Sequence, residues 1–428
     1  MKKSIFTSLI PVSNKHSLLY NALSDTFLIL SNKLKSVWEN ESIEKMSLHS
    51  TFYKLLLKGK YIVDENIDEF EYLKTQVNEI ICDKKDFHLI INPTLNCNFK
   101  CWYCYETHTV SKMSEETFER VQKFIGNKVK QSFLKHFHLS FFGGEPLIYF
   151  KDIVSKLLEF TYKECLLNDK KFSFSFTSNG VLIDDFCIST MQKYSDSRIS
   201  FQITLDGCKE DHDKVRFVSE SKGSYDRIMN NIEKLLENHI YVILRINFTT
   251  QNIHKVNKIL DDLRKPIFIN NKYLTVNFQQ VWQDSTSSVD ITDIVDETIS
   301  LFRENNIKVL YHNSDFIRNP CYADKKNEAI INYNGNVYKC TAVDFERTEK
   351  YGFLDAKGEI VWRNDKIEKR FKSILKNTLC HKCRIAPICG GGCTERTMEK
   401  SDKEYCLLNN DEVLKDKLIL YKFENKFL

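Results

Sequence analysis

The sequence lacks any long apolar run and any large excess of charge. No window among its 428 residues approaches 18 uninterrupted apolar side chains, which excludes a transmembrane helix. Lys and Arg number 62 against 58 Asp and Glu, so the formal net charge of +4 gives no reason to expect nucleic acid or a membrane as a partner. With 42% hydrophobic and 28% charged residues, the composition is that of a soluble globular protein of two or three domains.

A secretory signal is also missing. The opening segment MKKSIFTSLIPVSNK is interrupted at Thr7, Ser8 and Pro11, and no small-residue cleavage site follows it. A secreted disulfide scaffold explains the 14 cysteines poorly, because such scaffolds are usually small domains that cannot build a core of their own. We therefore expect a cytoplasmic protein whose clustered thiols bind metal.

The cysteines fall into two groups and a scattered remainder. Cys97, Cys101 and Cys104 form the first group. The second group lies in the last quarter of the chain and consists of Cys321, Cys340, Cys380, Cys383, Cys389, Cys393 and Cys406. The scattered thiols are expected to pack as small hydrophobic side chains: Cys82, Cys165, Cys187 and Cys208. Glycine is scarce, with 13 residues, and is concentrated in or beside the motifs described below.

The middle of the chain alternates between strand and helix patterns. Strand patterns occur at 88–94, 138–144, 172–180, 199–207, 241–249 and 273–281. Among the helical patterns between them, those at 114–133 and 224–238 have Ser114 and Ser224 as expected N-caps. Six βα units in series predict an α/β fold with a parallel sheet, and the right-handed crossover rule curls such a series into a partial (β/α)6 barrel over residues 88–285. In such barrels chemistry collects at the carboxyl ends of the strands.

The regions on either side of this barrel differ in pattern. Residues 1–87 contain a predicted β-hairpin at 17–31, then short helices, then a helix, a turn at Gly59 and a short strand, which together form a small α+β domain. Residues 286–320 are expected to form a linking helical segment. The cysteine-rich residues 321–428 are expected to form a third domain that ends in a helix.

The first group of thiols has the spacing of an iron–sulfur site. NCNFKCWYCYE, with the pattern CxxxCxxC, follows the first barrel strand directly. Thiolates are the usual ligands of such clusters, and three of them would leave one iron of a [4Fe–4S] cube open for catalysis. A zinc knuckle that lacks one ligand, or three unrelated thiols, are the alternatives on spacing alone.

Further motifs give the barrel a family resemblance. FFGGEP at 141–146, TSNG at 177–180 and TLDG at 204–207 end the second, third and fourth predicted strands. Together with CxxxCxYC after the first strand, these motifs resemble the radical S-adenosylmethionine (radical SAM) superfamily over about residues 88–285. Each tetrapeptide alone also fits an ordinary turn, and it is their order after successive strands that is specific.

The resemblance implies a cofactor pocket. In the family the GGEP motif binds the amino group of the methionine moiety, a role that falls here to Gly144 and Glu145. Arg216 of HDKVR resembles the arginine that pairs with the methionine carboxylate, and Tyr103 would pack against adenine. Thr204 stands where related maturases carry a serine and keeps the hydroxyl. The implied pocket consists of Tyr103, Gly143, Gly144, Glu145, Asn179, Thr204 and Arg216.

The resemblance also implies a reaction. A [4Fe–4S] cluster on the catalytic cysteines Cys97, Cys101 and Cys104 would bind S-adenosylmethionine through its open iron. One electron from the reduced cluster, supplied by a donor such as flavodoxin or ferredoxin, would give methionine and a 5′-deoxyadenosyl radical, which abstracts hydrogen from the substrate. The protein would position the reactants and exclude water.

The second group of cysteines resembles the SPASM extension found behind radical SAM domains. All seven cysteines of that pattern match, and the resemblance implies two auxiliary [4Fe–4S] clusters, hence three clusters in total. One would be held by Cys380, Cys383, Cys389 and Cys406. The other would be held by Cys321, Cys340 and Cys393, with no identifiable fourth ligand, so it is either open or completed from outside the motif. A structural zinc ribbon is the alternative.

Auxiliary clusters suit a net oxidation, because they accept single electrons. The N-terminal hairpin and helices resemble, in outline, the winged-helix peptide-recognition domains of peptide maturases, which would capture a leader by an added strand. We therefore expect a ribosomally made precursor peptide as partner and an oxidative crosslink (thioether, C–C or ether) as product.

Two other functions stay open. Sulfatase-maturating relatives, which form formylglycine, carry an Asp directly after the GxxxxC cysteine as the base, whereas this chain has Thr341 there and Asp344 three residues on. Formylglycine formation is therefore the alternative reaction. An iron–sulfur or zinc redox scaffold without catalysis is an alternative of a different class, against which the intact CxxxCxYC and Glu145 argue.

Overall fold

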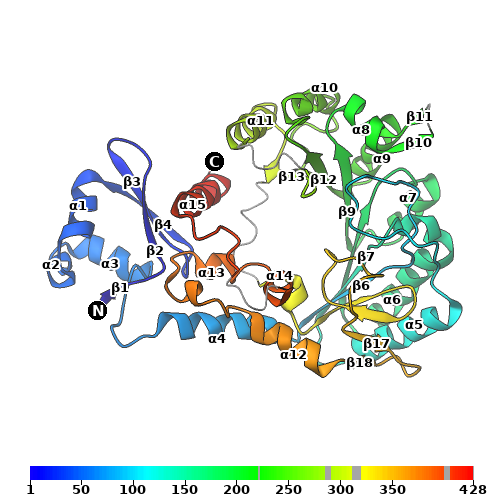
Figure 1. Ribbon diagram of the computed structural model, residues 1–428, viewed down its shortest axis with the longest axis horizontal. Coiled ribbons are helices and arrows are strands. Elements are labelled where there is room, and N and C mark those ends of the chain that lie inside the picture. Colours follow the sequence, from blue (N-terminus) through cyan, green and yellow to red (C-terminus); the bar gives the residue numbers. More distant parts are fainter. Residues whose placement is uncertain (220–221, 285–290, 311–319, 400–404, 428) are drawn as a thin grey trace. The chain divides into compact units, whose positions relative to one another are not determined.

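The computed structural model describes residues 1–219, 222–284, 291–310, 320–399 and 405–427. The chain divides into two compact units (Figure 1). The sheet unit comprises Lys84–His312 and Asn327–Arg363. The terminal unit comprises Met1–Asp83, Asn313–Lys326 and Asn364–Leu428. Within the described residues no helix has both the length and the apolar character needed to cross a membrane.

The sheet unit is built on an 11-stranded, mostly parallel sheet. The six predicted barrel strands are adjacent in chain order and all parallel, which confirms the α/β fold and the series of βα units. They are β6 (Asp86–Ile91), β7 (His136–Phe141), β8 (Lys171–Ser178), β9 (Arg198–Asp206), β12 (Tyr241–Phe248) and β13 (Leu274–Gln280). The short strand β14 (Val309–Leu310) extends the sheet beyond β13 in parallel.

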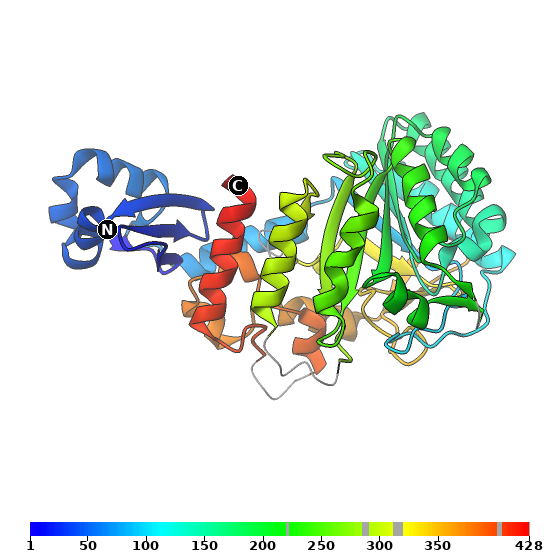
Figure 2. The ribbon, with the colours of Figure 1, turned by 90° about the horizontal axis from the view of Figure 1, so that it is seen from above.

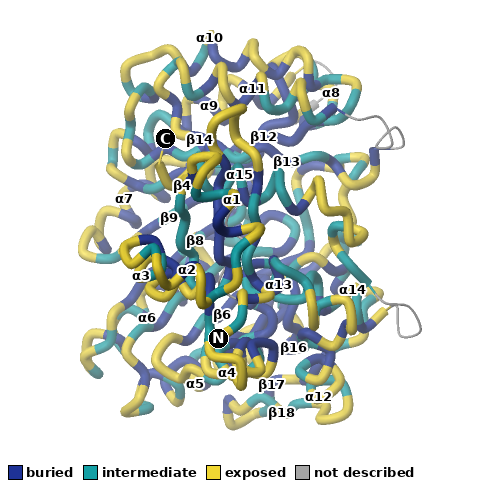
Figure 3. Tube along the Cα trace, turned by 90° about the vertical axis from the view of Figure 1, so that its left-hand side faces the viewer, coloured by how far each residue is buried: buried dark blue, intermediate teal, exposed yellow. Residues whose placement is uncertain are grey.

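Helices cover the outer face of this sheet (Figures 1 and 2). They are α5 (Glu115–Val129), α6 (Ser155–Leu167), α7 (Asp185–Gln192), α9 (Tyr225–Glu237), α10 (Ile259–Leu263) and α11 (Thr292–Glu304). Shorter elements lie between them: η1 (Pro146–Tyr149), η2 (Phe150–Val154), α8 (Lys209–Val215), β10 (Phe217–Ser219), β11 (Lys222–Gly223) and η3 (Ile253–Lys258). The trace of α5 and α10 alternates between buried and exposed residues, as amphipathic helices do (Figure 3).

The two predicted helix caps differ in outcome. The hydroxyl of Ser114 accepts the Thr117 N–H, so the predicted N-cap of α5 is confirmed. Ser224 precedes α9, but its side chain makes no capping bond. Asp213 instead accepts the backbone N–H groups of Ser224 and of the next residue, at 2.8 and 3.0 Å, because the Ser224 hydroxyl is engaged elsewhere.

The segment after Cys321 contributes strands to the sheet unit. β15 (Glu328–Ile331) pairs in parallel with β6, and β16 (Asn336–Tyr338), β17 (Gly352–Leu354) and β18 (Ile360–Trp362) continue antiparallel. This pairing is why residues 327–363 group with the sheet unit, unlike the expected domain over 321–428. The expected linking segment at 286–320 contains helix α11. Its residues 286–290 and 311–319 lie outside the described residues.

The terminal unit begins with a three-stranded antiparallel sheet. It contains β2 (Thr7–Pro11), β3 (His16–Asn21) and β4 (Thr26–Ser31), so the predicted hairpin is confirmed, with Asp25 at φ 56° in its turn. The predicted helix, turn and strand are α3 (Ser50–Lys58), Gly59 and β5 (Ile62–Val63), which pairs with β1 (Lys2–Lys3). Helices α1 (Asn32–Asn40), α2 (Ile43–Ser47) and α4 (Glu69–Ile81) complete this part.

The two ends of the chain share one hydrophobic core in this unit. Phe6, Leu18 and Tyr20 of the N-terminal part cluster with Ile388 and Ile419 of the C-terminal part. The C-terminal part contains η4 (Tyr322–Asp324), α12 (Asn364–Ser373), η5 (Thr378–Lys382), α13 (Ala386–Cys389), α14 (Thr394–Glu399) and α15 (Glu412–Phe427). The peptide-recognition outline of residues 1–87 stays a prediction, but those residues do not pack as a separate body.

Candidate active site and cysteine clusters

The first group of thiols lies in the loop that follows β6, at the carboxyl end of that strand as expected. Cys97 and Cys101 are half-buried and Cys104 is exposed. The Cys104 N–H donates to the Cys101 carbonyl at 3.0 Å, and the Cys104 Sγ lies 3.3 Å from His108 Nε2. Burial raises the pKa of Cys97 to about 12, so its thiolate requires a cationic partner. An iron–sulfur cluster fits this donor set, since it binds deprotonated thiols.

The two glycines of GGEP allow this loop to pack against the end of β7. A Cβ on Gly143, which has φ +92°, would lie 2.4 Å from the Thr94 carbonyl oxygen. A Cβ on Gly144 would lie 2.2 Å from the Asn96 oxygen and 2.4 Å from the Leu95 oxygen. The glycines are therefore required by the backbone of the cluster loop itself. Their contact with a methionine amine stays a prediction.

Glu145 connects the ends of two strands to the cluster loop. It is fully buried. One carboxylate oxygen accepts the Leu147 N–H and the Ser178 hydroxyl, at 3.0 and 2.9 Å, and the other accepts the Asn179 N–H at 2.8 Å. Its own N–H donates to the Asn96 carbonyl at 2.9 Å. Burial raises the pKa of Glu145 to about 7. The side chain thus has a structural role, and its predicted contact with an ammonium group stays a prediction.

Asn179 joins the third strand end to the same loop. Its side-chain amide donates to the Asn98 Oδ1 at 2.8 Å and accepts the Val181 N–H at 3.1 Å. The next residue, Gly180, has φ +78°, a left-handed conformation that favours glycine. The TSNG motif therefore contacts the cluster loop through Asn179, which the family resemblance places in the cofactor pocket.

A buried polar network connects the cluster loop with β9 and β12. Tyr103 and Arg216 both donate to the carboxylate of Asp206, and Arg216 Nη2 also donates to the Tyr103 hydroxyl at 2.8 Å. Asn247 donates to the same hydroxyl at 3.1 Å and to Asp206 at 3.2 Å. Burial opposes ionisation of Asp206, but the Arg216 charge and the Tyr103 hydrogen bond outweigh it and lower its pKa. The adenine and carboxylate contacts of Tyr103 and Arg216 stay predictions.

Asp206 and Asn247 were not predicted as site residues. Asp206 stands in the TLDG motif, which was the available signal, whereas nothing in the sequence marks Asn247. His212 supports the network by accepting the Asp206 N–H at 3.1 Å, and its other ring nitrogen lies 2.9 Å from the Ser224 hydroxyl. Burial lowers the pKa of His212 to about 3. Thr204 lies two residues before Asp206, on the same face of β9.

The loop after Cys340 contacts the cluster loop within the sheet unit. The Tyr105 hydroxyl donates to the Thr341 carbonyl at 2.9 Å, and the Thr107 hydroxyl donates to Asp344 at 2.7 Å. Burial, reinforced by the nearby Asp344 carboxylate, raises the pKa of Glu106 to about 8. Asp344 is thus beside the first cluster loop although it does not directly follow the cysteine.

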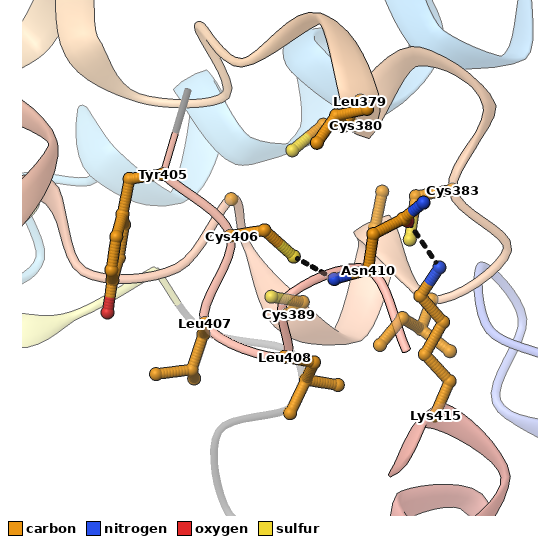
Figure 4. A pocket seen from close by; sticks show the side chains of 13 residues that line it. Leu379, Cys380, Cys383, Cys389, Tyr405, Cys406, Leu407, Leu408, Asn410 and Lys415 are labelled. Carbon is orange, nitrogen blue, oxygen red and sulfur yellow. Dashed lines mark hydrogen bonds between the residues drawn. The ribbon is translucent and has the colours of Figure 1, made fainter. Parts of the chain in front are cut away.

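Four thiols of the second group line one pocket in the terminal unit (Figure 4). They are Cys380, Cys383, Cys389 and Cys406, the set that the SPASM resemblance assigns to a single cluster. Burial, reinforced by the thiols of Cys383 and Cys406, raises the pKa of Cys389 to about 11. The residues present therefore fit a group that binds four thiolates, one to each iron. Within the described residues, no three His, Cys, Asp or Glu side chains are arranged to hold a single metal ion.

The remaining three predicted ligands are divided between the units. Cys340 belongs to the sheet unit, and Cys321 and Cys393 belong to the terminal unit. Arg370, which is 1% exposed, pairs with Asp324 at 2.9 Å and with Glu395 at 2.5 Å. This buried network joins the segment after Cys321 to the helix after Cys393, and no pattern in the sequence indicates it.

The chain also resembles known proteins in sequence. Residues 91–263 match the sequence profile of the Radical SAM superfamily. The cysteine-type anaerobic sulfatase-maturating enzyme of Clostridium novyi (strain NT) is 26% identical over 350 residues, which cover 72% of this chain and 88% of that enzyme. GTP 3′,8-cyclase of Clostridium botulinum (strain Hall / ATCC 3502 / NCTC 13319 / Type A) is 30% identical over 154 residues, which cover 36% of this chain and 44% of the cyclase.

Two solved structures share the fold. "Native anSMEcpe with bound AdoMet" superposes with a TM-score of 0.59 at 21% identity and covers 79% of this chain and 97% of its own. Streptococcus suis SuiB bound to precursor peptide SuiA superposes with a TM-score of 0.54 at 18% identity and covers 94% of this chain and 98% of its own. The cysteine loop, the ordered strand-end motifs and the profile match agree that residues 91–263 form a Radical SAM domain, which implies a [4Fe–4S] cluster and S-adenosylmethionine.

Proposed function

We propose that this radical SAM enzyme oxidises a ribosomally made precursor peptide and forms an intramolecular crosslink in it. The observation that carries the proposal is the extent of the fold similarity. The superposition with the SuiB–SuiA complex covers 94% of this chain and so takes in most of residues 1–87, whereas that with anSMEcpe covers 79%. The N-terminal part is therefore common to this chain and to a protein seen with a precursor peptide.

The residues of the sheet unit would prepare the reaction. S-Adenosylmethionine on a [4Fe–4S] cluster supplies a 5′-deoxyadenosyl radical that abstracts hydrogen from the substrate. Cys97, Cys101 and Cys104 would hold that cluster, and Gly144 keeps their loop against the end of β7. The Asp206–Arg216 pair fixes Tyr103 of the same loop. These residues orient the reactants and exclude water, and the reactive chemistry belongs to the cofactor.

The cysteine-rich residues would hold the clusters that accept the remaining electron of the oxidation, after hydrogen abstraction has removed the first. We propose two auxiliary [4Fe–4S] clusters, one on the four thiols of the pocket in Figure 4 and one on Cys321, Cys340 and Cys393. A substrate radical must lose one electron to close a new bond, and such clusters accept single electrons. A flavodoxin or ferredoxin would supply the electron that starts the cycle, and the 14 cysteines, most of them clustered as predicted metal ligands, favour the cytoplasm as its location.

The N-terminal sheet would bind the leader of the peptide. β2 and β4 are the edges of the three-stranded sheet, so either can accept an added strand. Ile29 on β4 is 59% exposed, which is unusual for an isoleucine in a short edge strand and gives the leader an apolar contact. The resemblance of residues 1–87 to winged-helix peptide-recognition domains is a prediction from the sequence that agrees with this role.

Formylglycine formation is the second candidate. Three of the curated relatives, at 23–26% identity, are cysteine-type anaerobic sulfatase-maturating enzymes. Asp344 lies beside the cluster loop through its bond to Thr107. Burial acts to raise the pKa of Asp344, but hydrogen bonds from Thr107 and from a backbone N–H outweigh this effect, and the pKa is lowered. Asp344 is therefore a weak base in this position. For that reason we place crosslinking first.

One experiment separates the two candidates. Anaerobically reconstituted protein is incubated with dithionite, S-adenosylmethionine and either the short peptide encoded beside its gene or a sulfatase-type Cys peptide. Crosslinking predicts a precursor lighter by two hydrogens, because one bond formed from C–H and X–H is a two-electron oxidation, with no reaction toward hydrazine. A hydrazine-reactive aldehyde on the Cys peptide would move the enzyme to the second candidate.

A further inference from the structure

A buried lysine lines the pocket of four thiols. Lys415 of α15 is 2% exposed and lies among the residues that line the pocket with Cys380, Cys383, Cys389 and Cys406 (Figure 4). Its ammonium donates to the side-chain oxygen of Asn410 at 2.7 Å and to Glu412 at 2.5 Å. Lysine is rarely buried to this degree unless an anionic partner requires it.

The ion pair of Lys415 has one buried partner and one exposed partner. Glu412 is 62% exposed and also binds Arg384, at 2.7 Å, which in turn binds Asp416 at 2.7 Å. Water therefore screens the Glu412 carboxylate, whereas the Lys415 side chain is only 3% exposed. The buried end of this charge group is the Lys415 ammonium, and Lys415 belongs to the lining of the pocket.

Lys415 also fixes the loop that closes the pocket. Asn410 has φ +58°, and its backbone N–H donates to the Cys406 Sγ at 3.2 Å. Because Lys415 holds the Asn410 side chain, it maintains the backbone orientation that this N–H···S bond needs. Hydrogen bonds to cluster sulfurs and nearby charge are two of the levers that set the reduction potential of a cluster.

We infer that Lys415 is a positioning residue that favours the reduced form of the auxiliary cluster on Cys380, Cys383, Cys389 and Cys406. Reduction adds one negative charge, which the buried ammonium and the oriented N–H stabilise. The lysine thereby prepares this cluster to accept an electron from the substrate radical. The inference rests on the proposed presence of a cluster in this pocket.

The test uses the full-length chain with Cys97, Cys101, Cys104, Cys321 and Cys340 replaced by Ala, so that only this cluster remains. Anaerobic reconstitution is followed by iron analysis and by a redox titration monitored by electron paramagnetic resonance. Lys415→Met should lower the ratio of reduced to oxidised cluster at a fixed solution potential by about tenfold, which is about 59 mV for a one-electron couple. Lys415→Arg should restore most of the ratio, and Lys417→Met on the same helix should leave it unchanged.

Each outcome decides the inference. If the parent holds no iron, the cluster assignment fails and the inference with it. If the parent holds about four iron but Lys415→Met titrates like the parent, or Lys417→Met shifts equally, the inference alone fails. If Lys415→Met loses its cluster, retention of the cluster by Lys415→Arg supports the role of the charge. Loss of the cluster in both variants would show that Lys415 serves only in packing.

Discussion

Gly144 and Asn96 are in such close contact that a Cβ on the glycine would lie 2.2 Å from the asparagine carbonyl oxygen. The first residue lies in the loop after β7, and the second directly precedes Cys97 in the loop that carries the predicted catalytic cysteines. Carbon and oxygen cannot approach so closely, so the position of that loop depends on the missing side chain.

Gly144→Ala should therefore displace the cluster loop and remove the first cluster. We expect a loss of about four iron per chain and of S-adenosylmethionine cleavage, measured by iron analysis and release of 5′-deoxyadenosine. Gly126→Ala in α5 is the matched control, because its Cβ would meet nothing closer than 3.8 Å. That control should raise the free energy of unfolding by up to about 1 kcal/mol. A Gly144→Ala protein with full cleavage activity would refute the role of this contact.

Replacing Cys97, Cys101 and Cys104 together by Ala should abolish S-adenosylmethionine cleavage and leave the iron of the auxiliary sites. The three thiols share one loop, and none of the second group lies in it. Dithionite-driven release of 5′-deoxyadenosine gives the readout. Cys165→Ala, which removes a buried thiol on α6, is a control that should retain the activity. Turnover in the triple variant would remove the catalytic assignment.

The reconstituted protein should contain about 12 iron and 12 sulfide per chain, since each of three cubes holds four of each. Replacing the four thiols of the pocket in Figure 4 by Ala should lower the iron content by about four. Parallel iron and zinc analysis provides the measurement. A protein with about four iron and one or two zinc would instead contain a structural zinc site among its C-terminal cysteines.

The buried His212 should make stability depend on pH. Burial lowers the pKa of His212 to about 3, whereas the unfolded chain binds a proton near 6.5. The folded state therefore binds fewer protons below pH 6.5, and its stability is lost as pH falls toward 3. The slope approaches about 1.4 kcal/mol per pH unit. Urea unfolding between pH 7.5 and 4.5 should show a weaker dependence for His212→Gln, and equal slopes would contradict this origin.

The leader-binding proposal is better tested by a point change than by deletion. Removing residues 1–87 would expose the core that Phe6 and Tyr20 share with Ile388 and Ile419. Ile29→Lys on the edge of β4 leaves that core intact, and we expect it to weaken peptide modification at least tenfold while S-adenosylmethionine cleavage persists. Val361→Lys, also at an exposed strand position but in the sheet unit, is the control. Equal peptide modification by the unaltered protein, the Ile29→Lys variant and the control variant would exclude β4 as the leader site.

Local features were predictable from the sequence because neighbouring residues determine them. The Ser114 cap, the hairpin at 17–31 and the six barrel strands depend on periodicity and turn chemistry within a few positions. The Tyr103–Asn247 bond joins residues 144 positions apart, and no local pattern indicates it. The same holds for Lys415 and Arg370, whose burial depends on how distant segments pack. The strand β15 was missed because its partner, β6, lies far earlier in the chain.

The shared core of the terminal unit has a consequence for biosynthesis. During translation, Phe6 and Leu18 emerge long before Ile385 and Ile419, with the whole radical SAM domain made between them. The first part must therefore wait, incompletely packed, until the last helix is synthesised, and such long-range closure is slow and prone to aggregation. The sheet unit can fold while the terminal unit waits, so the predicted first cluster could assemble before the proposed cluster at Cys406. From this nested order we expect dependence on chaperones and a need for iron late in synthesis.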